Sequence, residues 1–214
     1  MSDISVPYLK YSEVRDFADK FLARYHPSLD LPIPIEQIVE FQMDIDIFPM
    51  HGLATDFDGD SLEVEGYTSL HRKTITVDNW IYLNRPYRYR FTLAHEVGHY
   101  FMHTAVYESE PFKNIDEWKD FIRNFPQSEY DKFEWQAYAF AGLILVPGAP
   151  LEKVIEQRLK EVVDKVKQQG LNPKNFSEYI WDTVCEIVGE NFEVSSAVIS
   201  KRVDFDNLKK RFKF

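Results

Sequence analysis

The sequence predicts an α+β fold in which helices surround a small mixed or antiparallel sheet. Segments with the short alternation typical of strands are confined to about residues 44–77. Apolar residues recur with a helical period before this region and through most of the chain after it. Strands that precede a long central helix, with helices on either side, are the arrangement expected of an α+β domain.

The first predicted element is a core-facing helix near the N-terminus. Ser12 is its expected N-cap, and its apolar residues recur at the i, i+3, i+4, i+7 spacing. A proline-rich connection follows, in which Pro34 can open a short second helix. Residues 44–48 then alternate acidic and apolar side chains, which predicts a strand with one face in water. The apolar positions of the first helix are Val14, Phe17, Ala18, Phe21, Leu22 and Tyr25.

Two more strands are predicted before the central helix. Residues 62–70 and residues 74–77 have strand-like composition, and His71 belongs to the turn between them. The DFDGD segment at residues 56–60 lacks the later ligands of a calcium-binding EF-hand loop. We therefore expect a turn there and not a calcium site.

The central helix should run over residues 86–103. Asn84 is its expected cap, and Pro86 suits its first turn. Gly98 lies in its interior, where glycine is unfavourable by about 1 kcal/mol relative to alanine. Such a residue is expected where another backbone or a pocket comes close to the helix.

Helices are predicted for the remainder of the chain. Aromatic residues from Trp118 onward have helical spacing, and residues 133–147 form a strongly apolar helix that a proline ends. Past residue 150 the helices are amphipathic, and the segment EVSSAVISKRV, with Ser195 as N-cap, resembles the turn and second helix of a helix-turn-helix. We expect one domain over residues 1–150 and a C-terminal helical module over residues 151–214, packed on the first.

Composition restricts the class of protein. The 214 residues carry a formal charge of −10, and such a surface repels phosphate backbones, so nucleic acid is not the expected partner. The single cysteine, Cys185, lies on the apolar side of a helical stretch and is expected to be buried and inert. The first ten residues, MSDISVPYLK, lack the apolar core expected of a signal peptide, and the longest charge-free stretch, residues 135–151, is too short and too broken to span a bilayer. These features predict a cytoplasmic location.

The segment FTLAHEVGHYFMH contains His95, Glu96 and His99 in the pattern HExxH. On a helix, histidines four residues apart lie about 40° apart around the axis and one turn apart along it. Both imidazoles can therefore bind one metal ion. Glu96 then leans over the open side of that ion, where a general base belongs. The alternative is a chance match, and the surrounding sequence must decide.

A third ligand is needed, and two residues are candidates. His103 has rotated by about 80° from His95 and lies two turns away, so we expect it to support the site without binding the ion. Glu134 begins the apolar helix and shares a stripe with small residues, where a carboxylate at a close helix contact needs a partner. A metal held by His95 and His99 is the partner we expect. The alternative is that Glu134 only decorates the positive end of its helix.

Two motifs together, RFTLAHEVGHYFMH and EWQAYAFAGLILVP, resemble the pattern of the ImmA/IrrE family of metallopeptidases. LPIPIEQIVEF, TITVD and VSSAVISKRV are similar to weaker parts of that pattern. Gln136 stands where many relatives have a second acid, which favours Glu134 as the ligand. The resemblance implies a zincin-like fold, one zinc ion and cytoplasmic endopeptidase activity. It also implies that the substrate is a helix-turn-helix repressor of the phage or mobile-element type.

The leading hypothesis is a zinc endopeptidase in which Glu96 takes a proton from the attacking water. An extended substrate would add to the strand at residues 74–77, and Tyr138 and Tyr100 are the candidates for stabilising the oxyanion, whose donor the sequence does not identify. A second hypothesis is a binding module whose zinc is structural and which docks on a repressor or toxin without cutting it. Direct DNA binding through residues 195–203 is a third.

Overall fold

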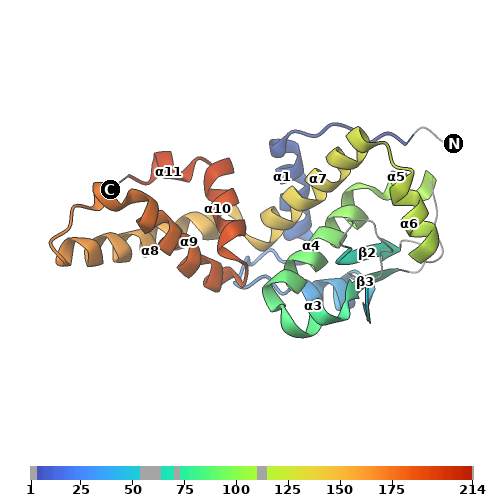
Figure 1. Cartoon of the computed structure of the whole chain (residues 1–214), viewed down its shortest axis with the longest axis horizontal. Helices are drawn as coiled ribbons and strands as arrows, with labels where there is room; N and C mark the ends of the chain where they lie inside the picture. Colours follow the sequence, from blue (N-terminus) through green and yellow to red (C-terminus); the bar gives the residue numbers. More distant parts are fainter. Residues whose placement is uncertain (1–3, 54–63, 70–72, 110–114, 214) are drawn as a thin grey trace. The chain divides into compact units, whose positions relative to one another are not determined.

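The computed structural model describes the chain in four stretches. Figure 1 labels the helices and strands along the chain. The turn predicted at residues 56–60 and the turn histidine His71 lie outside the described residues, as does part of the strand predicted at residues 62–70. The described stretches are residues 4–53, 64–69, 73–109 and 115–213.

The chain divides into two compact units. One consists of Met1–Pro27 and Pro34–Ile144, and the other of Ser28–Ile33 and Leu145–Phe214. The first unit contains the sheet and the HExxH helix, whereas the second contains the C-terminal helices. Each unit is described by itself.

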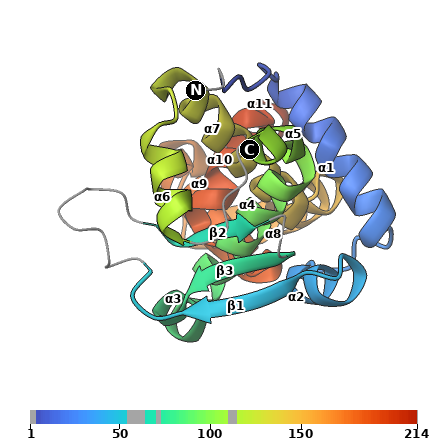
Figure 2. The ribbon, with the colours of Figure 1, turned by 90° about the vertical axis from the view of Figure 1, so that its right-hand side faces the viewer.

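Three strands form one mixed sheet in the order β1-β3-β2. β3 is parallel to β1, with Ile75 opposite Ile47, and antiparallel to β2, with Ile75 opposite Thr68. Figure 2 shows β3 between its two neighbours. A small mixed sheet in a mostly helical chain confirms the predicted α+β class. The strands are β1 (Asp46–Met50), β2 (Gly66–Ser69) and β3 (Thr74–Asp78).

The central position of β3 corrects one prediction. Residues 74–77 were expected to offer an edge to an extended substrate, but β3 is hydrogen-bonded to a strand on each side. A strand paired on both sides has no free row of backbone groups for another chain. Among the described strands, the edges belong to β1 and β2.

Helix α4 (Pro86–Met102) is the predicted central helix and begins at its proline. Asn84 does not cap it, because Asn84 ends the preceding α3 (Asn79–Asn84), which the sequence did not predict. The Asn84 side-chain amide donates to the Trp80 carbonyl at 2.9 Å. Asp78 caps α3 instead, accepting from two N–H groups of its first turn at 2.9 and 3.1 Å.

The N-terminal helix α1 (Tyr11–Tyr25) starts before its predicted cap. Lys10 is the N-cap, and the Glu13 carboxylate accepts its N–H at 2.7 Å. Ser12 therefore lies inside the first turn, and its prediction as N-cap is wrong. The short helix expected after Pro34 is present as α2 (Ile35–Gln37), which continues as the π-helical η1 (Ile38–Gln42).

The apolar helix α7 (Gln127–Leu145) begins well before residue 133, where the sequence analysis placed its start. Pro126 precedes it, and the Pro126 carbonyl accepts from the N–H groups of Glu129 and Tyr130 at 2.9 Å each. Glu134 is consequently in the interior of the helix and not at its positive end. Two shorter helices come before it, α5 (Thr104–Ser109), which was not predicted, and α6 (Ile115–Arg123).

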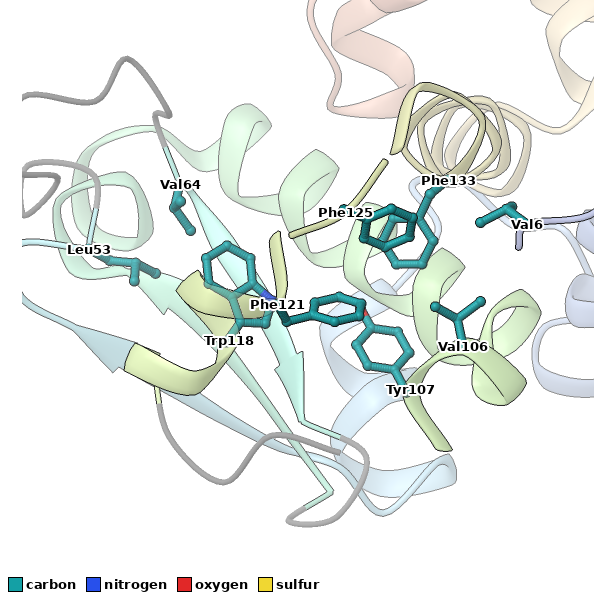
Figure 3. Packing of buried hydrophobic residues seen from close by; sticks show 9 residues of the cluster. All are labelled: Val6, Leu53, Val64, Val106, Tyr107, Trp118, Phe121, Phe125 and Phe133. Carbon is teal, nitrogen blue, oxygen red and sulfur yellow. The ribbon is translucent and has the colours of Figure 1, made fainter. Parts of the chain in front are cut away.

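Aromatic packing holds these helices together in the first unit. Phe21 of α1 contacts Phe101 of α4 and Phe140 of α7 edge-on, with ring centroids 5.6 Å apart in both pairs. A second cluster joins α5, α6 and α7 to the N-terminal segment through Val6, as Figure 3 shows. Its buried members are Val6, Leu53, Val64, Val106, Tyr107, Trp118, Phe121, Phe125 and Phe133.

The second unit has its own apolar core between α8, α9 and α10. Gly189 of α9 lies so close to the following connection that a Cβ would come within 2.7 Å of the Val194 carbonyl oxygen. Ser195 is the N-cap of α10, as predicted. The helices are α8 (Gly148–Gln168), η2 (Pro173–Phe176), α9 (Ser177–Phe192), α10 (Ser196–Phe205) and α11 (Leu208–Arg211).

Two expectations came from composition, namely that Cys185 is buried and that no segment spans a membrane. Cys185 is buried, and burial raises the pKa of its thiol to about 11, so it carries little reactive thiolate at neutral pH. No single helix of the described stretches is long and apolar enough to cross a membrane. Taken together, α7 and α8 pass that test by length and composition.

Candidate metal centre

The two histidines of the HExxH pattern face each other on α4. Their Nε2 atoms lie 2.9 Å apart, and their rings are nearly perpendicular, at 79°. The side chain of His99 is 3% exposed and that of His95 15%. His95 therefore lies at the accessible side of the pair and His99 at the buried side.

Glu134 reaches this pair from α7. Its two carboxylate oxygens lie 3.3 Å from Nε2 of His95 and 3.5 Å from Nε2 of His99. One ligand atom from each of the three residues falls within 4.8 Å of the others. Tetrahedral zinc with metal–nitrogen distances near 2.0 Å separates its ligand atoms by roughly 3.3 Å. The three side chains thus form a possible metal site.

A glycine allows α4 and α7 to approach each other closely enough for this cluster. A Cβ on Gly98 would lie 3.2 Å from both the Cα and the carbonyl oxygen of Ala137, and 3.2 Å from the Phe140 ring. The expectation that Gly98 marks a close backbone approach is therefore confirmed. Gly98 lies between the two histidines, directly before His99 and about one turn after His95, and Ala137 lies about one turn after Glu134.

The protonation states of the three groups suit a cation. Burial lowers the pKa of His99 to about 3. Burial opposes ionisation of Glu134, but the interactions with His95 and His99 outweigh it and hold the pKa of that carboxyl well below its usual range. Burial also opposes the charged form of His95, whose pKa Glu134 nevertheless raises. A neutral imidazole beside an ionised carboxylate matches what divalent metals require of their ligands.

Glu96 lines the same cavity as His95, His99 and Glu134 but is not part of their cluster, and a strand of the sheet holds it in place. Thr68 of β2 donates its hydroxyl to Glu96 Oε2 at 2.9 Å and lies 3.2 Å from the Glu96 carbonyl oxygen. Glu96 is only 5% exposed, and burial raises its pKa to about 7. The carboxyl group can thus both take up and release a proton near neutral pH.

Thr68 and Gly66, two residues apart on β2, were not predicted as site residues from the sequence. A Cβ on Gly66 would lie 3.3 Å from Cγ of Glu96 and 2.9 Å from Cγ2 of Thr92, so β2 must carry glycine where it crosses α4. Strand alternation could have placed Thr68 and Gly66 on one face of β2. Nothing in the sequence indicates that this face meets Glu96.

His103 does not join the cluster of His95, His99 and Glu134. It lies behind His99, with the two Nδ1 atoms 3.1 Å apart, and its Nε2 lies 2.9 Å from Oε1 of Gln136. Burial lowers the pKa of His103 to about 4, so its ring is neutral. His103 thus contacts His99 and Gln136, and its supporting role stays a prediction; the contact with Gln136 was not predicted from the sequence.

A comparison with protein families bears on the whole arrangement. The model of a peptidase family, described as the IrrE N-terminal-like domain, matches residues 42–204, which include all the residues of the cluster and Glu96. The chain belongs to this family. Membership implies a metallopeptidase that acts on a protein or peptide substrate. A search of curated proteins found no significant match.

In this IrrE-like peptidase the cluster of His95, His99 and Glu134 opens into a cavity of about 270 Å³. Its walls come from β2 and the two residues before it and from α4, α5, α6 and α7, and six of the lining side chains are those of Phe, Tyr or Trp. Arg88 and Glu65 at one side form an ion pair, and Thr92 also donates to Glu65 at 3.1 Å. Much of the surface offered to a ligand is therefore apolar. The aromatic lining residues are Phe91, Tyr107, Trp118, Tyr130, Phe133 and Tyr138.

Four tyrosines are relevant to the search for an oxyanion donor in the IrrE-like domain. Of the two candidates taken from the sequence, Tyr138 lines the cavity, whereas Tyr100 is not among the described residues that do. Tyr107 and Tyr130 line it as well, and neither was singled out from the sequence. Burial, together with the negative charges of Glu96 and Glu134, raises the pKa of both tyrosines, so both hydroxyls keep their protons.

Proposed function

We propose that the protein is a zinc-dependent endopeptidase whose centre is His95, His99 and Glu134, with Glu96 as general base. The observation that carries this proposal is the convergence of three metal-ligand side chains beside a buried carboxyl group, at the wall of a cavity. Two imidazoles and a carboxylate are a ligand set of catalytic zinc sites, which keep one position open. Family membership supports the same reaction class.

The chain's own residues supply the proton transfers. A bound zinc ion lowers the pKa of a coordinated water and polarises a carbonyl oxygen. Glu96 accepts the proton of the attacking water as the new C–O bond forms, then gives it to the nitrogen as the C–N bond breaks. Thr68 keeps one carboxylate oxygen of Glu96 fixed during both transfers.

Tyr130 is the residue we assign to stabilising the oxyanion. It precedes Glu134 by one turn of α7, and its hydroxyl stays protonated as a donor. It is partly exposed to the cavity, whereas Tyr107 is only 5% exposed. The variant Tyr130→Phe should lower kcat with little change in KM, because the hydroxyl acts on charge that develops in the transition state.

The edge that receives an extended substrate is reassigned to β2. Val64 and Gly66 line the cavity next to Glu96, and in the described part of the sheet β2 pairs only with β3. A peptide added to this strand would obtain main-chain hydrogen bonds and pass the metal cluster. This arrangement would be that of a zincin-like fold.

We further propose that the substrate is a helix-turn-helix repressor in the cytoplasm. The family resemblance supports this substrate, and the helix pair α9–α10 supports a helix-turn-helix-like module over residues 151–214 beside a peptidase domain over residues 1–150. An acidic chain, with a charge of −10, suits a protein partner better than DNA. The second candidate is a zinc-containing module that binds such a repressor without cutting it.

One experiment separates the two candidates. The zinc-loaded protein and its Glu96→Gln variant are incubated with the repressor encoded next to its gene, and the intact mass of the repressor is followed. An endopeptidase yields two fragments whose masses sum to that of the repressor plus one water, and Glu96→Gln prevents their formation. A repressor that stays intact while it binds the wild-type protein would contradict the endopeptidase and support the binding module.

A further inference from the structure

A chain of hydrogen bonds between buried side chains runs from His99 of the candidate metal centre to the backbone of the N-terminal segment. The Nδ1 atoms of His99 and His103 lie 3.1 Å apart, Nε2 of His103 lies 2.9 Å from Oε1 of Gln136, and Nε2 of Gln136 lies 2.7 Å from the Pro7 carbonyl oxygen. The three side chains are 3%, 2% and 1% exposed. Buried polar groups of this kind need a donor opposite each acceptor.

The Pro7 end fixes the direction of every bond in the chain. A carbonyl oxygen can only accept, so the NH2 group of Gln136 must face Pro7, and its Oε1 must face His103. Nε2 of His103 therefore carries the hydrogen. In a neutral imidazole the other nitrogen is then an acceptor, so Nδ1 of His103 must receive a hydrogen from Nδ1 of His99.

We propose that Gln136 and the Pro7 carbonyl are positioning groups that fix the tautomer of His99, so that its Nε2 lone pair faces Glu134 and the metal site. The proposal rests on the assignment of His99 as a metal ligand. It agrees with a separate contact, because of the two Nε2 atoms that face each other at 2.9 Å only one can accept from the other. The chain of bonds makes His99 the acceptor and His95 the donor.

The N-terminal segment is held firmly enough to serve as this reference. Glu129 of α7 accepts the N–H of Val6 at 2.7 Å, and Lys132 donates to the Val6 carbonyl at 3.0 Å. Glu129 and Lys132 thus bind the backbone of Val6, and Gln136 binds that of Pro7. The three side chains come from successive turns of α7. The Val6 side chain is 1% exposed within the cluster of Figure 3.

Aromatic packing fixes the planes of the two imidazoles. Phe133 stacks on His99 with centroids 4.0 Å apart and on His103 with centroids 4.5 Å apart. Stacking restrains the ring planes but does not distinguish one nitrogen from the other. The choice of tautomer is therefore left to the hydrogen bonds with Gln136 and Pro7.

The first test is the tautomer itself, read from long-range 15N–1H correlations of the histidine rings in the full-length, metal-free protein at neutral pH. The expected pattern is hydrogen on Nδ1 of His99 and on Nε2 of His103. Hydrogen on Nε2 of His99 would overturn the proposal without any variant. This readout does not depend on proteolysis. If the tautomers are as expected but no substrate is cleaved, only the proposed function is contradicted.

The second test replaces the amide with an apolar group of similar length, Gln136→Met, and uses Gln127→Met on the same helix as the control. Gln127 is exposed, and its side-chain amide donates to Asp131 at 2.7 Å. Gln136→Met should mix the His99 and His103 tautomers and weaken zinc binding by about 10–100-fold. The control should change neither. Unchanged tautomers and zinc affinity in a folded Gln136→Met would overturn the proposal.

A charged replacement gives an independent check if the methionine variant folds poorly. In Gln136→Glu the carboxylate keeps the acceptor toward His103 but loses the donor to Pro7, and it places negative charge against the carbonyl oxygen. The His103 tautomer should then be retained while the N-terminal segment loosens, seen as faster exchange of the backbone amide hydrogens of Val6 and Tyr8, which flank Pro7. Unchanged amide exchange at these residues would overturn the assignment of the Pro7 carbonyl as a positioning group.

Discussion

The two sides of the metal cluster hold their carboxyl groups in opposite ways. On the β2 side, Glu96 accepts one hydrogen bond from the neutral hydroxyl of Thr68, and burial raises the pKa of Glu96 to about 7. On the α7 side, Glu134 faces two imidazoles that outweigh its burial and keep it ionised. The same residue type is thus prepared for proton transfer in one place and for metal binding in the other, and the neighbours decide which.

The largest effect should come from the α7 side. Glu134→Gln removes the anionic ligand, and zinc affinity should fall by more than the roughly 10–100-fold typical of losing a group that only supports a ligand. Competition titration with a zinc chelator measures the change, and Asp131→Asn on the exposed part of α7 is the control. Zinc binding as tight as in wild type would show that Glu134 is not a ligand.

The next effect should come from the β2 side and leave the metal in place. Glu96→Gln keeps the size of the side chain but cannot take up a proton, so kcat should fall by about 10²–10⁴-fold. Zinc affinity, measured in the same titration, should stay at the wild-type value. A variant that lost zinc together with activity would contradict the division of labour between the two carboxyl groups.

A smaller effect is expected from the hydroxyl that holds Glu96. Thr68→Val is nearly isosteric and removes a hydrogen bond to a group that becomes charged, which is worth about 1.5 kcal/mol, or roughly tenfold in kcat. Thr76→Val, on the neighbouring β3, is the buried control. If Thr68→Val leaves kcat at the wild-type value, then Thr68 does not position the base.

The smallest effect tests the contact that joins the two sides. Gly98→Ala gains about 1 kcal/mol of helix propensity but must fit a Cβ 3.2 Å from the Ala137 backbone, and overpacking of this kind costs about 1–3 kcal/mol. Urea unfolding of the metal-free protein should show a net loss of roughly 1 kcal/mol. A more stable variant with unchanged zinc affinity would show that the approach of α7 to α4 is not tight.

The comparison also explains which parts could be predicted from the sequence. His95, Glu96 and His99 share one helix, so helical geometry alone relates them. Glu134 could be proposed because a carboxylate among small apolar residues needs a partner. Its place within α7 was wrong, since that helix begins directly after Pro126, before the apolar run starts, and apolar periodicity does not reveal such a start.

The supporting residues could not be found in the same way. Thr68 and Pro7 reach the centre from a strand and from the N-terminal segment, and only tertiary packing brings them there. Strand order is a further property that local pattern leaves open, because the composition of residues 74–77 suits a central strand and an edge strand equally well. Contacts between segments that are distant in the sequence could therefore not be predicted for this centre.

Diffraction from crystals of the zinc-loaded protein, with data collected on both sides of the zinc absorption edge, tests the account most directly. A single anomalous peak should lie within coordination distance of Nε2 of His95, Nε2 of His99 and the Glu134 carboxylate, with the Glu96 carboxylate still bonded to Thr68 and not bound to the metal. A peak coordinated by Glu96 in place of Glu134, or one located away from both histidines, would contradict it.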